Sequence, residues 1–309
     1  MTLRGRSFIS LHDYDAEDLT TILRLAVQLK DELRVGKPHP LLAGRTLGMI
    51  FQKNSTRTRV SFEVGMAQLG GQALFLSSAD LQLHRGETVA DTARVLGRYL
   101  DGIMARTYAH ADVEDLARYS GVPVINGLSD LLHPCQAMAD LLTIQEKTGR
   151  LAGIRLSYVG DANNVSNSLM QAGAILGLHV RVGSPAGYQP QPEMLAQARA
   201  LAAQSGAEIH VIEDPVEAVR DADVVYTDTW ASMGQEAEHE KRVRIFRPYQ
   251  VHAQLMARAA KNAVFMHCLP AHRGEEVTDE VMDGAQSVIL DQAENRLHVQ
   301  KAILALTMR

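Results

Sequence analysis

The sequence predicts an α/β protein of two domains, each a mostly parallel sheet flanked by helices, with interdomain helices joining them. Two observations support this prediction. Short apolar runs alternate with helix-length stretches along almost all of the 309 residues, and such alternation is typical of parallel sheets covered on both faces. The length also exceeds that of a usual single domain, about 100 to 150 residues, so we expect two cores.

The first half begins with a helix over 15–33, where apolar residues recur at helical spacing. Asp15, Glu17 and Asp18 stand in its first turn, where the helix dipole favours negative charge. Strands and helices then alternate. The predicted strands are 46–51, 72–77, 102–106 and 122–126, and the helices between them are 57–70, 88–100 and 112–120.

A helix over 134–148 is predicted to bridge the domains, because Pro134 suits its first position and Gly149 its end. A second alternation follows, with strands at 154–160, 179–184, 208–213, 223–230 and 263–271 and helices at 167–177, 192–206, 216–222 and 251–260. The closing stretch 295–308 is helical in pattern. We therefore expect domains at 1–148 and 149–291, followed by a C-terminal helix within 292–309.

Composition excludes several classes of function. Apolar residues make up 46% and charged residues 22% of the chain, which is ordinary globular usage. A net charge of −5 gives no overall positive field for nucleic acid or membranes. The chain has neither a membrane-length apolar run nor a secretory signal, so we expect a cytoplasmic location. Cys135 and Cys268 form no framework of paired spacings and are expected to be free thiols.

The segment KNSTRTRVSF at 53–62 places cations and hydroxyls where a strand passes into a helix. A helix N-terminus attracts anions through its unpaired N–H groups, and Arg57 adds a planar fork that matches phosphate oxygens. These residues predict a phosphate site. A simple Ser55 cap beside solvated cations is the alternative that the segment alone leaves open.

Further polar residues follow other strands of the first half. Arg106 ends a strand, and HPCQ at 133–136 begins the bridging helix. Carboxyl ends of parallel strands share one edge, where ligands bind, so Arg106 and His133 are expected beside the phosphate. Each alone is also compatible with surface charge or a loop contact. The long loop 77–88 is either a lid or a solvated connector.

The second half carries polar groups at corresponding places. GDANNV at 160–165 has one glycine instead of the three of a dinucleotide fingerprint, so Asn163 and Asn164 are expected to donate to a carboxylate or to cap a helix. Asp228, at a strand end, is suited to an ammonium. Cys268, in HCLP, is either a site thiol or a buried structural cysteine.

STRTR, HPCQ, DTWASMG and HCLP, in this order over the whole chain, resemble the aspartate/ornithine carbamoyltransferase family. STRT and HP-Q resemble elements common to the family, whereas the Cys of HPCQ, the SMG after Asp228 and HCLP resemble its ornithine-using members. The resemblance implies transfer of a carbamoyl group from carbamoyl phosphate to the δ-amino group of L-ornithine, giving L-citrulline and phosphate in arginine biosynthesis. It implies direct attack without a covalent intermediate, no cofactor and no metal.

The resemblance also assigns site residues. Those implied for carbamoyl phosphate are Ser55, Thr56, Arg57, Thr58, Gln82, Arg106, His133, Pro134, Cys135, Gln136 and Arg296. Those implied for ornithine are Asn164, Asp228, Ser232, Met233, Cys268 and Leu269. Arg106, His133 and Cys268 are the implied catalytic residues. Gln82 is expected to come from a neighbouring subunit of a homotrimer or an assembly of trimers, and the last helix to pack back on the first domain.

Other interpretations stay open. The acceptor could be putrescine, which would leave Asp228 partly unused, or N-acetylornithine. Aspartate is disfavoured because the loop 77–88 has no lysine. A non-catalytic sensor of carbamoyl phosphate or an amino acid could dispense with Arg106, His133 and Cys268. A nucleic-acid binder built on STRTR conflicts with the acidic balance. The direction of the reaction in the cell is not set by the sequence.

Overall fold

The computed structural model describes residues 3–82, 86–231 and 236–309. The chain forms two compact units, unit 1 from Met1–Leu142 with Glu294–Arg309 and unit 2 from Thr143–Ala293. The divisions fall inside two helices, α5 (Pro134–Thr148) and α12 (Ile289–Thr307), which therefore run from one unit into the other. The expected α/β class, with a parallel sheet in each part and helices joining them, is confirmed.

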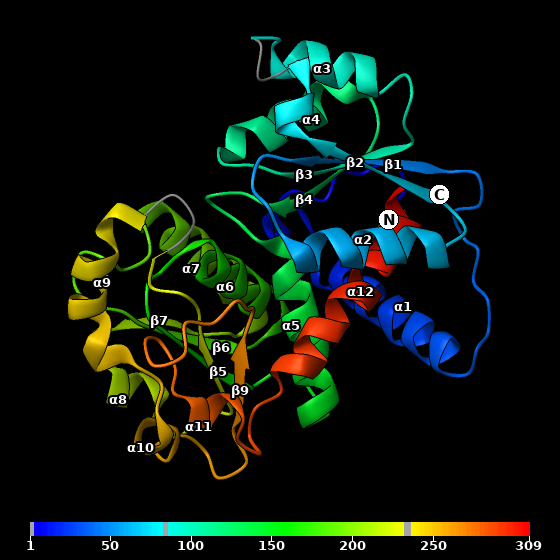
Figure 1. Ribbon diagram of the computed structural model, residues 1–309. Coiled ribbons are helices and arrows are strands. Elements are labelled where there is room, and N and C mark those ends of the chain that lie inside the picture. Colours follow the sequence, from blue (N-terminus) through cyan, green and yellow to red (C-terminus); the bar gives the residue numbers. More distant parts are fainter. Residues whose placement is uncertain (1–2, 83–85, 232–235) are drawn as a thin grey trace. The chain divides into compact units, whose positions relative to one another are not determined.

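Unit 1 contains a four-stranded parallel sheet (Figure 1). In spatial order its strands are β2 (Gln72–Ser77), β1 (Thr46–Phe51), β3 (Gly102–Arg106) and β4 (Val124–Leu128). Its other helices are α1 (Ala16–Arg34), α2 (Thr56–Gln68), α3 (Val89–Leu96) and α4 (His110–Ser120), with short 3-10 helices at Leu11–Asp13 and Ser78–Asp80. β3 (GIMAR) and β4 (VINGL) are buried along their whole length, which explains why their sequences do not alternate between apolar and polar residues.

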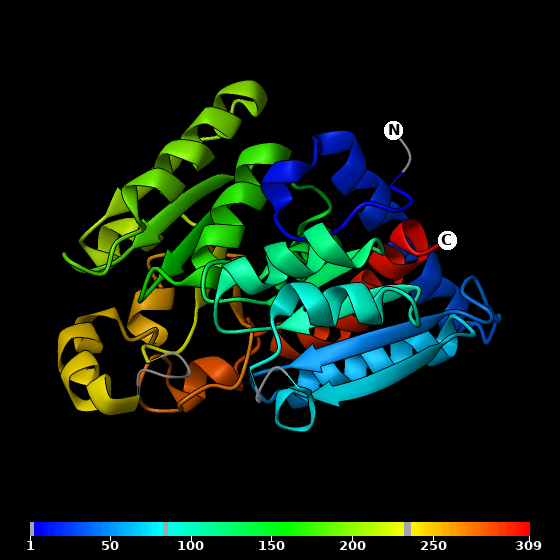
Figure 2. The ribbon, with the colours of Figure 1, turned by 90° about the horizontal axis from the view of Figure 1, so that it is seen from above.

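Helices cover both faces of this sheet. Figures 1 and 2 show α3 and α4 over one face and α2 and α12 over the other. On the first face Ala93 of α3 and Val113 of α4 pack with Ile50 and Ile103 of the strands. On the second, a Cβ added to Gly65 of α2 would lie 3.3 Å from Lys301 of α12. The C-terminal part of α12 is thus an integral layer of unit 1.

Unit 2 contains a five-stranded parallel sheet. In spatial order its strands are β7 (Ile209–Ile212), β6 (His179–Gly183), β5 (Arg155–Val159), β8 (Val224–Thr227) and β9 (Val264–His267). Its helices are α6 (Asn164–Leu176), α7 (Pro192–Ser205), α8 (Pro215–Val219), α9 (His239–Phe246), α10 (Ala253–Met256) and α11 (Asp279–Met282), with 3-10 helices at Glu236–Glu238 and Arg247–Tyr249.

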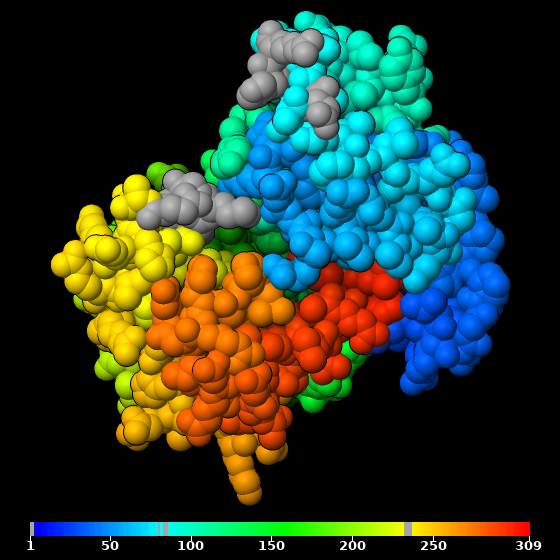
Figure 3. All heavy atoms as spheres, viewed as in Figure 1, coloured from blue at the N-terminus to red at the C-terminus, as the bar shows by residue number. Residues whose placement is uncertain are grey.

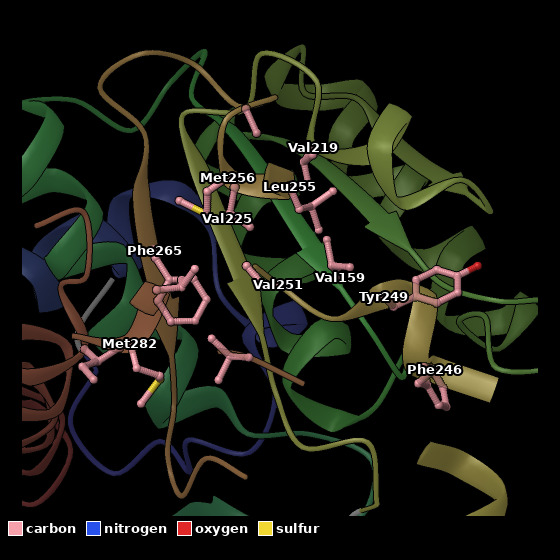
Figure 4. Close-up of a cluster of buried hydrophobic side chains, with 14 of the residues drawn as sticks. Val159, Val219, Val225, Phe246, Tyr249, Val251, Leu255, Met256, Phe265 and Met282 are labelled. Carbon is pink, nitrogen blue, oxygen red and sulfur yellow. The ribbon is translucent and has the colours of Figure 1, made fainter. Parts of the chain in front are cut away.

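A large apolar cluster fills one side of the unit 2 sheet, as Figure 4 shows. Val159 and Val225 project from the central strands toward Phe246 of α9 and Leu255 of α10. Most of these side chains are excluded from water, and burial of each large apolar side chain contributes about 1.5–3 kcal/mol. The cluster fixes the strand ends from which Asp228 and Cys268 follow.

Most elements appear where the sequence predicts them, with local differences. β4 begins two positions later than expected, and α3 stops before Gly97, which begins a turn. Helix α9 is absent from the sequence prediction because its buried residues are only Arg242 and Phe246, too few for an apolar stripe. Among the described helices none is long and apolar enough to cross a membrane.

Candidate active site

The first turn of α2 forms one side of the site in unit 1. Ser55 is the N-cap residue, and its Oγ accepts a hydrogen bond from the backbone N–H of Thr58 at 3.3 Å. Capping uses the hydroxyl as an acceptor, so its proton can still be donated to an anion. The first turn of α2 contains no acidic residue, and Lys53 lies directly before it with Nζ 4.4 Å from the ring centroid of Tyr108. This helix end is therefore positive.

Arg106 and His133 lie at or after the carboxyl ends of two neighbouring strands, β3 and β4. Arg106 is the last residue of β3 and is buried. After β4 a tight turn, in which the N–H of Ser129 donates to Leu132 O at 2.9 Å, leads into His133 immediately before α5. Because β3 and β4 are parallel neighbours, their carboxyl ends meet at one edge of the sheet, as the sequence predicts.

The imidazole of His133 is 5% exposed and lies close to three guanidinium groups. Burial holds the pKa of His133 well below its usual range, and Arg296, Arg106 and Arg57 lower that pKa further. A buried imidazole beside positive charge stays neutral. The positive field here therefore comes from the arginines, and His133 remains a neutral hydrogen-bonding group.

Arg296 connects three helices of unit 1. Its Nη1 donates to Gln136 Oε1 of α5 at 2.7 Å, and its Nη2 donates to Thr58 Oγ1 of α2 at 3.2 Å. The amide of Gln136 in turn donates to Asp140 Oδ1 at 2.8 Å. Arg296, Gln136 and Thr58 are all buried. These bonds fix the α12 guanidinium beside the first turns of α2 and α5.

The remaining predicted residues of unit 1 differ in their surroundings. Pro134 begins α5. Cys135 is fully buried and donates its thiol to Asn126 O with an Sγ–O distance of 3.4 Å, and burial raises the pKa of this thiol to about 12. Its side chain is thus a neutral packing group. Gln82 is exposed, and its backbone carbonyl oxygen accepts from the backbone N–H of Glu87 at 3.2 Å.

In unit 2 the strand ends bring Asp228 and Cys268 together. They directly follow β8 and β9, which are parallel neighbours. The Cys268 thiol donates to Asp228 Oδ1 with an Sγ–O distance of 3.1 Å, and Asn163 Nδ2 donates to Oδ2 at 2.7 Å. Asp228 is 8% exposed. A largely buried carboxylate is therefore held by a thiol and an amide.

The amide that contacts Asp228 belongs to Asn163, whereas Asn164 begins α6 and is half-buried. The side-chain oxygen of Asn163 also accepts from the N–H groups of Val165 and Ser166 at 2.9 and 3.4 Å. Asn163 is thus both the helix cap and a partner of the carboxylate. The single glycine of this segment, Gly160, has φ +137°, which an L side chain adopts only with strain.

Asp161 and Arg242 support this group and were not predicted. Arg242 Nη1 donates to Asp161 Oδ2 at 2.8 Å and to Trp230 O at 2.9 Å. Burial raises the pKa of Asp161 to about 6 against the opposing effect of Arg242. Asp161 stands in the noted GDANNV segment, but nothing in the sequence points to Arg242 as its partner. The pair attaches α9 to the loops after β5 and β8.

The segment after β9 is fixed by His267 and Glu276, which are both fully buried. His267 Nδ1 accepts from the N–H of Leu269 at 2.8 Å, and its Nε2 faces Glu276 Oε1 at 3.1 Å. Since Nδ1 accepts, the imidazole is the Nε2–H tautomer and donates to the carboxylate. Leu269 has φ +61°. Glu276 was not among the predicted residues, although it follows HCLP closely.

Ser232 and Met233 lie outside the described residues. The other predicted site residues form two groups, one in each unit. Unit 1 gathers arginines and hydroxyls around a neutral imidazole, which suits a phosphorylated anion. Unit 2 gathers a carboxylate with an amide and a thiol, which suits an ammonium-bearing ligand. Fold and site together define a two-unit α/β protein with an anion-binding group in its first unit and a carboxylate group in its second.

Comparison with known proteins agrees with this class. Residues 6–146 match the family model described as aspartate/ornithine carbamoyltransferase, carbamoyl-P binding domain, and residues 152–307 match its Asp/Orn binding domain. An ornithine carbamoyltransferase of Thermococcus kodakarensis is 60% identical over 308 residues, covering 100% of this chain and 98% of the relative. The chain belongs to the aspartate/ornithine carbamoyltransferase family.

Two matches from Pyrococcus furiosus are as similar. Its anabolic ornithine carbamoyltransferase is 61% identical over 308 residues, covering 100% of this chain and 98% of the relative. A solved ornithine carbamoyltransferase structure from the same organism superposes with a TM-score of 0.97 at 61% identity, covering 100% of this chain and 98% of the other. The similarity extends over both units.

Proposed function

We propose that this chain transfers the carbamoyl group of carbamoyl phosphate to the δ-amino group of L-ornithine, giving L-citrulline and phosphate. The observation that carries the proposal is the buried His133 imidazole, whose pKa is held well below its usual range by burial and by Arg296, Arg106 and Arg57. Relatives about 60% identical over the full chain that are named ornithine carbamoyltransferase support the choice of acceptor.

Carbamoyl phosphate binds to the unit 1 group in this proposal. Ser55, Thr56, Arg57 and Thr58 hold the phosphate at the positive end of α2. Arg106 contacts both the phosphate and the carbamoyl oxygen, and neutral His133 donates to that oxygen. Attack on the carbamoyl carbon creates an oxyanion and expels phosphate, so donors fixed at both places stabilise the charge that develops.

Other unit 1 residues complete the carbamoyl phosphate site. Gln136 and Arg296, already hydrogen bonded to each other, hold the carbamoyl group. Pro134 and Cys135 contribute through the first turn of α5, because the Cys135 thiol is engaged with Asn126. Gln82 reaches the site of a neighbouring subunit in a homotrimer or an assembly of trimers. Its exposure within one subunit supports this assignment.

Ornithine binds to the unit 2 group. Asp228 accepts the α-ammonium, while Asn164, Ser232 and Met233 hold the α-carboxylate side of the ligand. Cys268 and Leu269 face the δ-amino group. An alkyl ammonium has a pKa of about 10.4, so it must lose a proton before attack, and a desolvated site favours its neutral form. Cys268, whose thiol donates to Asp228, orients the δ-amine or takes its proton, and the amine attacks the carbamoyl carbon directly, without a covalent enzyme intermediate.

The citrulline-forming direction, and with it arginine biosynthesis, is supported by the word anabolic in the name of the P. furiosus relative. We place the protein in the cytoplasm. The described residues include no helix that could span a membrane, and the ligands that the site suits are small polar metabolites.

A panel of acceptors tests the proposal. The purified protein is mixed with carbamoyl phosphate and, in turn, ornithine, putrescine, N-acetylornithine or aspartate, and both ureido product and released phosphate are measured. We expect ornithine to give the highest kcat/KM by far. Preference for another amine would overturn the acceptor, and absence of product with every amine would favour the sensor interpretation.

A further inference from the structure

Two histidines and two glutamates gather at and just beneath the surface of unit 2, apart from the residues of the proposed function. His239 begins α9, and His272, Glu275 and Glu276 follow β9. His239 Nε2 lies 3.0 Å from Glu275 Oε2, and the two imidazole centroids are 6.3 Å apart. Ligand atoms of His272, Glu275 and Glu276 all lie within 4.8 Å of one another. Figure 3 shows α9 (yellow) and the segment after β9 (orange) at the surface.

Glu276 supplies a second, independent observation. Its carboxylate is fully buried. Oε1 accepts from His272 N at 2.6 Å and from His267 Nε2 at 3.1 Å. Oε2 has no hydrogen-bond partner within the described parts of the chain and lies 3.8 Å from His272 Nδ1. A buried carboxylate oxygen without a donor is unfavourable, and a cation bound between Oε2 and His272 would satisfy it.

We propose that His239, His272, Glu275 and Glu276 form a binding site for a divalent transition metal of the zinc class. Imidazole nitrogen and carboxylate oxygen are ordinary zinc ligands, and four of them suit its tetrahedral geometry. A site with two imidazoles discriminates against Mg²⁺ and Ca²⁺, which prefer oxygen ligands. The metal replaces the direct bond between His239 and Glu275 and uses the unsatisfied oxygen of Glu276.

Metal bound there joins two segments that support the unit 2 site. α9 carries Arg242, which holds Asp161, and Glu276 holds His267 beside Cys268 through its other oxygen. A cross-link between the two segments exists only in the folded chain, so the metal stabilises the folded state by mass action. The site is structural or regulatory, because none of its four ligands belongs to the proposed substrate groups.

The test must distinguish metal bound at the proposed site from metal bound at a second cluster. Asp228, His267 and Cys268 also place ligand atoms within 4.8 Å of one another, but Asp228 and Cys268 belong to the proposed ornithine site. A Cys268→Ser background removes the thiolate ligand from that cluster. His210, 3.2 Å from Glu208 Oε2 and exposed, offers a matched control, since it forms a histidine–glutamate pair outside both clusters.

Zinc titration by calorimetry at constant pH tests the proposal in Cys268→Ser protein that has been stripped of metal. We expect one equivalent to bind and the thermal midpoint to rise. His272→Gln or His239→Gln in this background should weaken binding at least tenfold, whereas His210→Gln should not. Circular dichroism without metal checks that each variant is folded, and the exposed position of His272 and the half-buried position of His239 favour this.

Cobalt(II) provides an independent readout. Bound to imidazole and carboxylate, Co²⁺ should show visible ligand-field bands in the wild-type protein, and these should disappear in His272→Gln. Strong sulfur-to-cobalt charge-transfer absorption in the wild type, with no cobalt bands left in Cys268→Ser, would instead place the metal at Cys268 alone and overturn the proposal. Absence of saturable zinc binding to Cys268→Ser, or equal affinity in His272→Gln and His210→Gln, would overturn it as well.

Discussion

For single residues, burial and neighbouring charge determine protonation in the unit 1 site. His133 is kept neutral by desolvation and by three guanidinium groups, and Cys135 is kept as a thiol by burial. His133 and Cys135 of HPCQ thus differ in role. His133 can donate to a developing oxyanion without a change of charge, while Cys135 serves the packing of α5 against β4.

Arg106→Ala is expected to lower kcat/KM for carbamoyl phosphate by about a hundredfold to a thousandfold, the usual cost of removing one donor to an oxyanion. The physical reason is the loss of a buried guanidinium beside His133. Steady-state citrulline formation measures it. Arg94→Ala, which removes an exposed arginine paired with Asp91, is the control. Unchanged citrulline formation in Arg106→Ala would show that Arg106 has no part in catalysis.

Asp228→Asn is expected to raise the KM for ornithine about tenfold to a hundredfold, because a hydrogen bond to a charged group contributes about 1.5–3 kcal/mol. The amide keeps one oxygen, which can accept from the Cys268 thiol or from Asn163 Nδ2 but replaces only one of the two carboxylate oxygens that now accept from them. Initial rates measured against each substrate separate the effects. A rise in the KM for carbamoyl phosphate of the same size would contradict the assignment of Asp228 to the amino acid.

Residues with a local signature could be predicted from the sequence. Ser55 and Arg57 stand where a helix begins, and Asp228 and Cys268 stand where strands end, so local pattern and strand parallelism locate them. Pairs that form only on folding could not. Arg242 meets Asp161 across 81 positions, and Arg296 meets Gln136 across 160. The resemblance to the carbamoyltransferase family pointed to Arg296. No physical feature of the sequence, however, identified Gln136 as its partner.

At the level of elements, α12 joins unit 1 through a buried lysine. Lys301 Nζ donates to Gln68 Oε1 of α2 at 2.8 Å and faces His39 Nε2 at 3.1 Å. Burial lowers the pKa of Lys301 to about 8, opposed by Glu32. Burial, and then the charge of Lys301, lower the pKa of His39. Because the ammonium donates to the imidazole, His39 stays neutral when Lys301 is charged.

This pair predicts a dependence of stability on pH. The pKa of His39 is lower in the folded state than its unfolded value of about 6.5. As the pH falls below that value, the unfolded chain binds a proton that folded His39 does not, so the free energy of unfolding decreases. His39→Gln keeps an acceptor for Lys301 and cannot take up this proton. Denaturant unfolding at pH 5, 6 and 7 should show a smaller decrease for the variant, and equal decreases would refute the prediction.

Elements with buried apolar runs could be predicted, whereas polar elements could not. β1 and β3 appear at the expected positions because they are buried and apolar. Helix α9 buries only Arg242 and Phe246, so its position depends on the Asp161 ion pair and on contacts of its apolar residues with the cluster in Figure 4. Such contacts have no periodic signal in the sequence.

For the whole molecule, the alternation of strands and helices was sufficient to predict two parallel sheets. It was not sufficient to predict strand order, because β1 lies between β2 and β3, and β5 lies between β6 and β8. Strand order depends on the crossover connections between strands, and the same alternation of strands and helices is compatible with several orders. In both sheets a switch in strand order occurs next to the first strand, and ligand groups of open α/β sheets gather at such switch points.

Mixed assemblies test the proposal that Gln82 acts in a neighbouring subunit. Gln82→Ala and Arg106→Ala chains should each have low activity alone. When the two are denatured and refolded together, some sites regain both wild-type residues from different chains, so activity should exceed that of either variant refolded by itself. No gain in the mixture, with assembly confirmed by mass in solution, would place Gln82 and Arg106 in sites within one chain.

The central claim is direct transfer of a carbamoyl group to ornithine, and ¹³C NMR with carbamoyl phosphate labelled at its carbonyl tests it. The account predicts that the carbonyl signal moves to the ureido carbon of citrulline in step with phosphate release, and only when ornithine is present. Two results would contradict the account. One is enzyme-dependent loss of the labelled carbonyl group from carbamoyl phosphate in the absence of ornithine. The other is label that mass spectrometry finds covalently attached to the protein.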